Sequence, residues 1–211
     1  FNAEDLSRAG LYVGCFVAFD PGLDVTEAGF VNARHLDDKG GVALVLTAAK
    51  GLLEAGVELP VDCHLLFTIS EEVGSGASSV LQGDVAEMLT VDNAPSDRGQ
   101  NSREFGVTLA MMDSSGPFDY HLTQKLHQLC RDFRLPHQLD VFRYYRSDSA
   151  SALTAGNDLR TALVCFGVDA SHGWERTHID SLRITAELVA LYLQSEPVAM
   201  RDIQPLGPAK G

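Results

Sequence analysis

Apolar and polar positions follow helical spacing over three long stretches of the chain. Apolar residues recur at intervals of three and four from Gly40 to Ala55 and from Asp180 to Leu193, which predicts two helices packed on a core. A third helix is predicted from Phe118 to Phe133, and shorter helices at residues 77–81 and 150–155. Helices therefore recur along most of the sequence.

Short apolar runs separate these helices and predict strands. The runs lie at residues 61–69, 87–92, 107–113, 137–144 and 161–168. Strands that alternate with helices are typical of the α/β class, and 211 residues with 45% hydrophobic content can bury a sizeable core. We therefore expect an α/β fold with helices on both faces of a sheet.

Charge and cysteine content narrow the classes of function. Asp and Glu number 29 against 16 Lys and Arg, an acidic balance that argues against nucleic-acid binding. The four cysteines (Cys15, Cys63, Cys130 and Cys165) are widely spaced and form no CxxC pair, so we expect buried thiols in a reducing compartment. No signal peptide or membrane span is evident, which favours a cytoplasmic location without membrane partners.

Two adjacent glutamates, Glu71 and Glu72, end the apolar run LLFTIS. Strands disfavour carboxylates, and neighbouring carboxylates repel each other, so the pair suggests a chemical role. One glutamate could bind a metal while the other handles a proton. The alternative is that the pair only supplies negative charge near the N-terminus of a helix.

Other acids occupy similar positions at the ends of predicted elements. Asp37 and Asp38 precede the helix at Gly40, and Asp92 closes the run EMLTVD. In open α/β sheets ligands bind beyond the carboxyl ends of the strands. Three such acidic loops therefore suggest one shared site.

Two histidines follow the last predicted strand. His172 and His178 lie in the segment ASHGWERTHID, just before the final helix. Imidazole and carboxylate together are the usual ligands of zinc and related metals, although a single histidine is more often a surface or core residue. The recurrence of acids and histidines at comparable loops favours metal binding.

The order HLDDKGG, ISEEVGSGA, TVD, YRSDSAS and SHGWERTHID resembles the glutamyl and deblocking aminopeptidases, dinuclear metallopeptidases that include the tetrahedral aminopeptidases. The resemblance covers nearly the whole chain. The segments DSSGPFDYHLT and FRYYRSDSASAL further resemble the branch encoded beside enzymes that make an acetylated glutamine dipeptide osmolyte.

The resemblance implies a role for each candidate residue. Asp37 would bridge two divalent ions, zinc or cobalt or alternatively manganese, Glu72 and His172 would complete one ion's ligands, and Asp92 would bind the other. Glu71 would be the general base, taking a proton from the water between the ions and delivering it to the departing amine.

Several residues near the candidate ligands have more than one possible role. His172 is favoured over His178 as the ligand, which leaves His178 as a contact of the ligands or substrate. Glu175 and Arg176 could position that loop by pairing their charges. Asp148 matches an aspartate near the family's site, or is an ordinary helix N-cap.

The family pattern also predicts the domain organisation. Residues 1–31 resemble the end of an inserted β domain, residues 32–197 a three-layer α/β/α catalytic domain, and residues 198–211 a tail. The family's histidine-x-aspartate motif would precede Phe1, so the chain is expected to be the C-terminal part of a longer protein.

Three functions remain open at this point. The first is a metal-dependent aminopeptidase that acts on peptides or small amides within a homo-oligomer. The second is a related amidohydrolase or deacetylase of small N-acylated compounds. The third is an inactive, truncated assembly subunit, because the absent motif would leave one ion with only Asp37 and Asp92.

Overall fold

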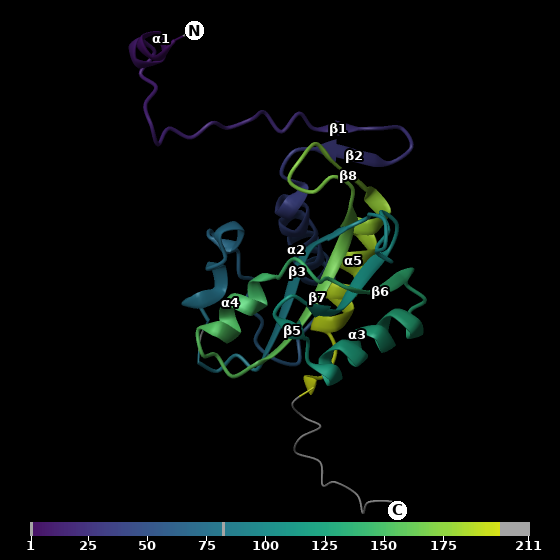
Figure 1. Ribbon diagram of the computed structural model, residues 1–211. Coiled ribbons are helices and arrows are strands. Elements are labelled where there is room, and N and C mark those ends of the chain that lie inside the picture. Colours follow the sequence, from purple (N-terminus) through teal and green to yellow (C-terminus); the bar gives the residue numbers. More distant parts are fainter. Residues whose placement is uncertain (1, 82, 199–211) are drawn as a thin grey trace, which may run out of the picture.

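A mixed central sheet organises the molecule (Figure 1). The computed structural model describes residues 2–81 and 83–198. Strand β7 (Arg160–Val168) lies between β3 (Glu87–Pro95), to which it is parallel, and β4 (Val107–Asp113), to which it is antiparallel. On its other side β4 pairs with β6 (His137–Val141) and with the two-residue strand β5 (Gly116–Pro117).

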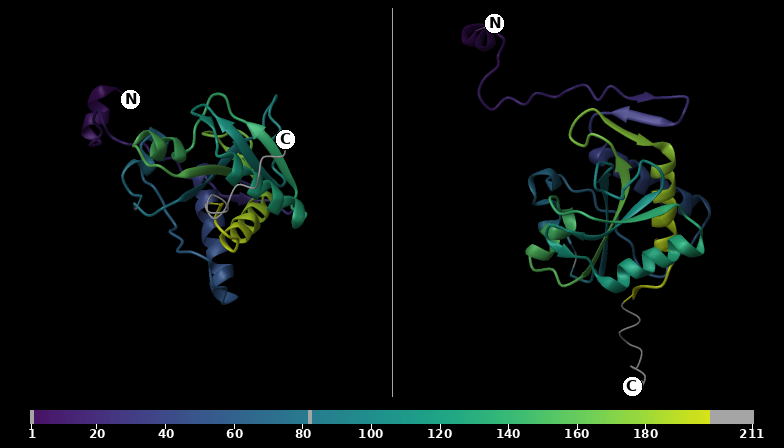
Figure 2. Two further views of the ribbon diagram at one scale, coloured as in Figure 1. Left: turned by 90° about the horizontal axis from the view of Figure 1, so that it is seen from below. Right: turned by 45° about the vertical axis from the view of Figure 1, so that its right-hand side comes forward.

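Helices cover both faces of this sheet, as predicted. Helices α2 (Leu36–Glu54), α3 (Tyr120–Asp132) and α5 (Ile179–Leu193) share the larger hydrophobic core with β4 and β7. The short helix α4 (Asp148–Thr154) lies on the opposite side, where a smaller apolar cluster fills the space (Figures 1 and 2). The result is the expected three-layer α/β/α arrangement.

The periodicity of the sequence explains why these helices pack here. Buried side chains on α3 recur every four residues at Leu122, Leu126 and Cys130, so one face of the helix meets the sheet. The Asp119 carboxylate caps this helix by accepting a hydrogen bond of 2.8 Å from the Leu122 N–H. Strand β7 is buried along nearly its whole length, as a central strand covered by helices should be.

A second, antiparallel sheet lies at one end of the molecule. It consists of β1 (Asp24–Val25), β2 (Phe30–Ala33) and β8 (Glu175–His178). The chain that leads to it begins at the small helix α1 (Ala3–Arg8) and runs outside the three-layer body (Figures 1 and 2). The sequence pattern did not predict β8, because only four residues separate the preceding turn from α5.

Two predicted elements are wrong. Residues 61–69 form no strand: their chain is irregular, and several of their apolar side chains are exposed. Within the described residues no neighbouring strand offers a hydrogen-bonded ladder to them, and periodicity alone cannot supply that partner. The predicted helix at 77–81 is only a 3-10 turn, η2 (Gly76–Ser78), which follows a similar turn, η1 (Glu71–Val73).

The cysteine prediction holds for half of the set. Cys130 and Cys165 are buried, whereas Cys15 is half-buried and Cys63 is exposed on the segment without a strand. The predicted tail lies outside the described residues except for Val198. None of the helices within residues 2–81 and 83–198 combines the length and apolar character needed to cross a membrane.

Candidate metal-binding and active site

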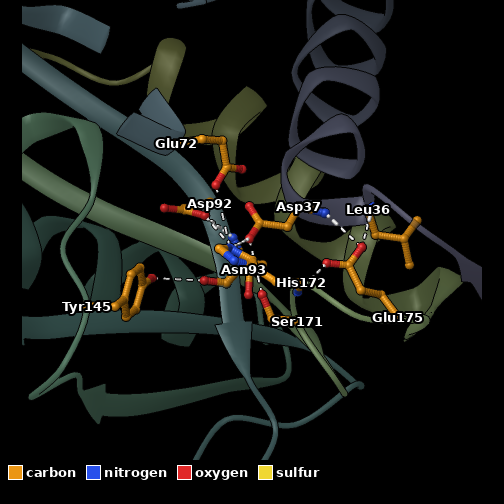
Figure 3. A network of polar contacts seen from close by, with 9 residues as sticks. All are labelled: Leu36, Asp37, Glu72, Asp92, Asn93, Tyr145, Ser171, His172 and Glu175. Atoms are coloured by element: carbon orange, nitrogen blue, oxygen red, sulfur yellow. Dashed lines mark hydrogen bonds and ion pairs between the residues drawn. The ribbon is translucent and has the colours of Figure 1, made fainter. Parts of the chain in front are cut away.

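A cleft of about 230 Å³ lies where the start of α2, the η1 turn, β3, the segment that leads into α4 and the loop after β7 come together (Figure 3). All five predicted site residues line it. Among the described residues, the lining consists of Asp37, Glu71, Glu72, Gly74, Asp92, Asn93, Tyr145, Arg146, Ser147, Ser151 and His172.

The first ligand cluster joins three of the predicted residues. His172 Nε2 lies 3.0 Å from Asp37 Oδ2 and 3.5 Å from Glu72 Oε2. Asp37 is nearly buried at the entrance of α2, where its backbone angles are not helical, whereas Glu72 and His172 are exposed on their loops. Ser171 Oγ donates a 3.1 Å hydrogen bond to Asp37 Oδ2, which further orients this carboxylate.

A second cluster shares Asp37 with the first. Oxygen atoms of Asp37, Asp38 and Asp92 all lie within 4.8 Å of one another. Asp92 is almost fully buried near the end of β3, and its Oδ1 accepts hydrogen bonds from Asn93 N–H (2.7 Å) and Nδ2 (3.2 Å). Asp38 was not among the predicted ligands, although the doubled acid in HLDDKGG was the signal that could have pointed to it.

Crowding of these carboxylates opposes their ionisation. Burial, followed by the charges of Asp37 and Glu71, raises the pKa of Asp92 well above its ordinary value. Burial, followed by the charges of Asp92 and Asp37, does the same to the pKa of Asp38. The negative charges of Asp37, Asp38 and Asp92 are therefore not balanced by nearby positive charge among the described residues.

The two glutamates behave in the same way. Burial raises the pKa of Glu71 from 4.5 to about 7, with further contributions from Glu72, Asp148 and Asp37. The pKa of Glu72 is also raised, first by burial and then by Asp37, although His172 opposes this shift. A carboxyl group with a pKa near neutrality can both accept and return a proton at physiological pH.

Asp148 anchors the loop that carries these glutamates. Its Oδ1 accepts a 2.7 Å hydrogen bond from the Ala77 N–H, and its Oδ2 accepts one of 2.8 Å from Thr68 Oγ1. Thr68 precedes the η1 turn and Ala77 follows it. Asp148 therefore links α4 to the chain on both sides of Glu71 and Glu72. Asp148 is the first residue of α4 and does not act as its N-cap.

The structure separates the two histidines. His178 does not line the cleft, and its hydrogen bonds go to Ala28 and Asp180, neither of which is a proposed ligand. Its ring lies against Phe30 and Phe105, its Nε2 is 2.9 Å from the Ala28 carbonyl oxygen, and its Nδ1 accepts a 3.1 Å hydrogen bond from the Asp180 N–H. His178 therefore caps α5 and ties it to the small sheet.

The suggested charge pair between Glu175 and Arg176 is also wrong. Arg176 instead makes a bidentate pair with Glu104, with both N–O distances at 2.7 Å. Neighbouring residues of a strand point to opposite faces, which is why the two side chains diverge. Glu175 points inward and is buried beneath the cleft.

The donor set fits divalent cations. Five carboxylates gather in and beneath the cleft (Asp37, Asp38, Glu71, Glu72 and Asp92), whereas Arg146 is the only lysine or arginine among the lining residues that the structure describes. Holding so many like charges close together, some of them buried, is unfavourable unless cations compensate them. Carboxylate oxygens with one imidazole nitrogen suit zinc, cobalt or manganese.

Comparison with known families agrees with this geometry. Residues 1–188 match the model of the M42 glutamyl aminopeptidase family. The chain belongs to this family. The YhfE protein of Bacillus subtilis (strain 168), to which an aminopeptidase activity is ascribed, is 40% identical over 195 residues. The match covers 92% of this chain and 56% of YhfE, so the chain spans little more than half of this M42 relative.

Solved structures share the same fold. An aminopeptidase from the archaeon Desulfurococcus kamchatkensis superimposes with a TM-score of 0.81 at 20% identity, over 99% of this chain and 61% of the other. The TET1 peptidase of Pyrococcus horikoshii, described as assembling into a tetrahedron or a large octahedral shell, gives a TM-score of 0.70 at 20% identity. That match covers 85% of this chain and 54% of the TET1 chain.

Proposed function

We propose that this chain carries the metal-binding and catalytic residues of an aminopeptidase that removes N-terminal residues from peptides. Family membership supports the reaction class. The observation that carries the proposal is the position of Asp37, whose carboxylate belongs to both ligand clusters. A shared carboxylate is what two neighbouring cations require.

The proposed ligands follow the two clusters. Asp37, Glu72 and His172 would hold one divalent cation, and Asp37 with Asp92 would hold the other, with zinc or cobalt preferred and manganese as the alternative. When bound, the cations would supply Lewis acidity toward the substrate carbonyl and toward the attacking water.

Glu71 is the proposed general base. Its carboxylate would accept a proton from water as the oxygen bonds to the peptide carbonyl carbon, and would deliver that proton to the amine nitrogen as the C–N bond breaks. Glu71 lines the same cleft as the ligands without belonging to either cluster, so its carboxylate remains available for proton transfer.

We further propose a homo-oligomeric, cytoplasmic enzyme with the division into residues 1–31, 32–197 and 198–211. The N-terminal arm (residues 2–23, ahead of β1) lies outside the three-layer body, which supports the first boundary. Strand β2 crosses this boundary and pairs with β8. The assembly described for the TET1 peptidase supports oligomerisation.

Metal content tests the site directly. Elemental analysis after reconstitution with zinc or cobalt should find metal bound to the parent chain and a large loss in the double variant Glu72→Ala, His172→Ala. A matched double variant, Glu54→Ala, His121→Ala, removes one acid and one histidine outside the cleft and should retain the metal. Equal metal in all three proteins would refute the ligand assignment.

Hydrolysis of aminoacyl amides tests the reaction. Glu71→Gln should retain bound metal and lose turnover by about 10²–10⁴-fold, the usual contribution of a general base. Loss of metal together with turnover would make Glu71 a ligand instead. Retained turnover would remove it from catalysis.

A further inference from the structure

Glu175 is a buried carboxylate beneath the cleft, and its hydrogen bonds within the described part of the chain all go to backbone N–H groups. Only 1% of the residue is exposed. One oxygen, Oε2, accepts hydrogen bonds from the Leu36 N–H and, at 3.3 Å, from the Asp37 N–H. The other oxygen, Oε1, accepts a 3.1 Å hydrogen bond from the His172 N–H (Figure 3). Glu175 does not itself line the cleft.

These N–H groups belong to two segments that are remote in sequence. Leu36 and Asp37 begin α2, and Glu175 lies 139 positions further along the chain, just after His172. The side chains of Asp37 and His172 meet at 3.0 Å on the cleft side. A single carboxylate therefore holds the backbones of both residues behind the point where their side chains converge.

The conformation of His172 makes this support necessary. Its φ of +63° lies in the left-handed region, which is unfavourable for a residue other than glycine. The hydrogen bond to Glu175 and that of the Gly173 N–H to the Ala170 carbonyl, at 2.8 Å, hold this turn. A change in the turn would move the imidazole away from Asp37.

Only a carboxylate can satisfy both sides of this arrangement. A glutamine oxygen placed toward Leu36 and Asp37 would turn its NH₂ group toward the His172 N–H, so that two donors would face each other. The reverse orientation creates the same conflict at α2. Among the described residues Glu175 forms no ion pair with a basic side chain, so its charge is stabilised by N–H dipoles.

We propose that Glu175 is a positioning residue that fixes Asp37 and His172 relative to each other and so sets the affinity of the cleft for a divalent cation. This inference rests on the proposed metal-binding function. Residues behind the ligands commonly change metal affinity by about 10–100-fold when replaced. Glu175 would act through Asp37 and His172 without touching the cation or the substrate.

Asp140 provides a matched control. It is also a buried carboxylate that accepts backbone N–H groups from a distant segment, at 2.8 Å from Asn101 and 2.9 Å from Ser102, and its other oxygen accepts from the Val141 N–H at 2.9 Å. Asp140 does not line the cleft. Asp140→Asn therefore introduces the same conflict between donors without touching the ligand segments.

The test is a competition titration of zinc or cobalt against a chromophoric chelator for the parent, Glu175→Gln and Asp140→Asn, with thermal unfolding measured in excess chelator. Both variants should unfold at lower temperature than the parent. Only Glu175→Gln should lose metal affinity, by about 10–100-fold, whereas Asp140→Asn should stay within about twofold of the parent. Equal affinity of Glu175→Gln and Asp140→Asn would overturn the proposal.

The outcomes separate this inference from the proposed function. A parent chain that binds no metal overturns both. A parent that binds metal, loses it in Glu72→Ala, His172→Ala and keeps it in Glu175→Gln overturns only the role of Glu175. If Glu175→Gln does not fold, Glu175→Asp carries the test, since it keeps both oxygens but shortens the reach, and unchanged affinity in that variant refutes the proposal.

Discussion

At the scale of single residues, the cleft is a set of carboxylates held closer together than their charges favour. Asp38, Glu71, Glu72 and Asp92 all have raised pKa values, with burial as the largest cause in each case. Without a cation, the folded chain therefore binds protons that the unfolded chain releases. Low pH and bound metal should both increase the stability of the folded chain, because each neutralises negative charge in the cleft.

The first prediction concerns pH. The pKa of Glu71 rises from 4.5 to about 7 on folding, so its contribution to stability is complete below pH 4.5 and is lost as the pH rises through 7. In chelator, the free energy of unfolding should therefore decline across this window, and Glu71→Gln should reduce the decline. Urea titrations at a series of pH values measure this free energy. A free energy of unfolding that rises with pH in both proteins would contradict the prediction.

A cation should counteract that decline. Metal binding requires deprotonated carboxylates, so metal affinity should increase over the same pH range while metal-free stability falls. Unfolding curves with and without zinc should diverge as the pH approaches 7. Curves that remain parallel would show that the titrating carboxylates do not bind the metal.

The second prediction concerns Asp148, for which an amide is an adequate replacement. Asparagine can accept from the Ala77 N–H and donate to Thr68 Oγ1, so Asp148→Asn should keep nearly the parent's metal affinity. Asp148→Ala leaves the buried Ala77 N–H unpaired, which should cost about 1–3 kcal/mol and weaken metal binding through the loop of Glu71 and Glu72. Chelator competition and urea unfolding distinguish the two variants, and equal behaviour would contradict the anchoring role.

At the scale of elements, close packing between β7 and the segment before β4 depends on a glycine. A Cβ at Gly167 would lie 1.9 Å from the Arg103 carbonyl oxygen. The Gly167 N–H donates to Ser181 Oγ at 2.9 Å, and its carbonyl accepts from Thr177 Oγ1 at 2.6 Å. A shift of β7 at this point would strain both of these hydrogen bonds.

The third prediction follows from this contact. Gly167→Ala should destabilise the chain by about 2–4 kcal/mol, because backbone atoms must shift to admit the methyl group. Gly51→Ala is the matched control, since Gly51 lies in α2 with open space around it, and it should stabilise the chain by about 0.5–1 kcal/mol. Urea midpoints at unchanged m-value measure both effects. Two substitutions of equal effect would refute the packing explanation.

Helices and strands could be predicted from the sequence wherever contact with the core requires apolar residues at regular spacing. Helix α3 and strand β7 each place their apolar side chains against a core, so their spacing identified them. Residues 61–69 carry the composition of a strand, but a strand also requires a neighbour, and composition does not reveal one. The grouping of Asp37, Glu72 and His172 was predicted from a resemblance. The hydrogen bonds of Glu175 join segments far apart in sequence, so only the three-dimensional structure reveals them.

At the scale of the whole molecule, apolar side chains lie uncovered on the N-terminal arm and on residues 61–69. Val13, Phe16 and Ile69 are fully exposed. Apolar surface gathered in this way commonly marks sites of protein association. The arm projects from the body, so its side chains can reach a second molecule (Figure 2).

The fourth prediction is that the chain self-associates. Sedimentation at increasing concentration should give a mass that rises above that of one chain, and the double variant Val13→Ser, Phe16→Ser should shift this rise to higher concentration. Leu53→Ser removes another exposed apolar side chain from α2 and serves as the control. A parent that stays monomeric throughout the range would contradict the prediction.

The residues that meet in the cleft lie far apart along the chain, and this separation has a consequence for the order of folding. Ser171 and Asp37, which hydrogen-bond in the cleft, are 134 positions apart. Contacts between residues so far apart in sequence form slowly, so we expect the cluster to assemble only after β3, β7 and α2 have docked. A metal ion added during refolding would therefore have no formed site to bind before the rate-limiting step. It would slow the unfolding of the finished molecule and leave its rate of formation unchanged.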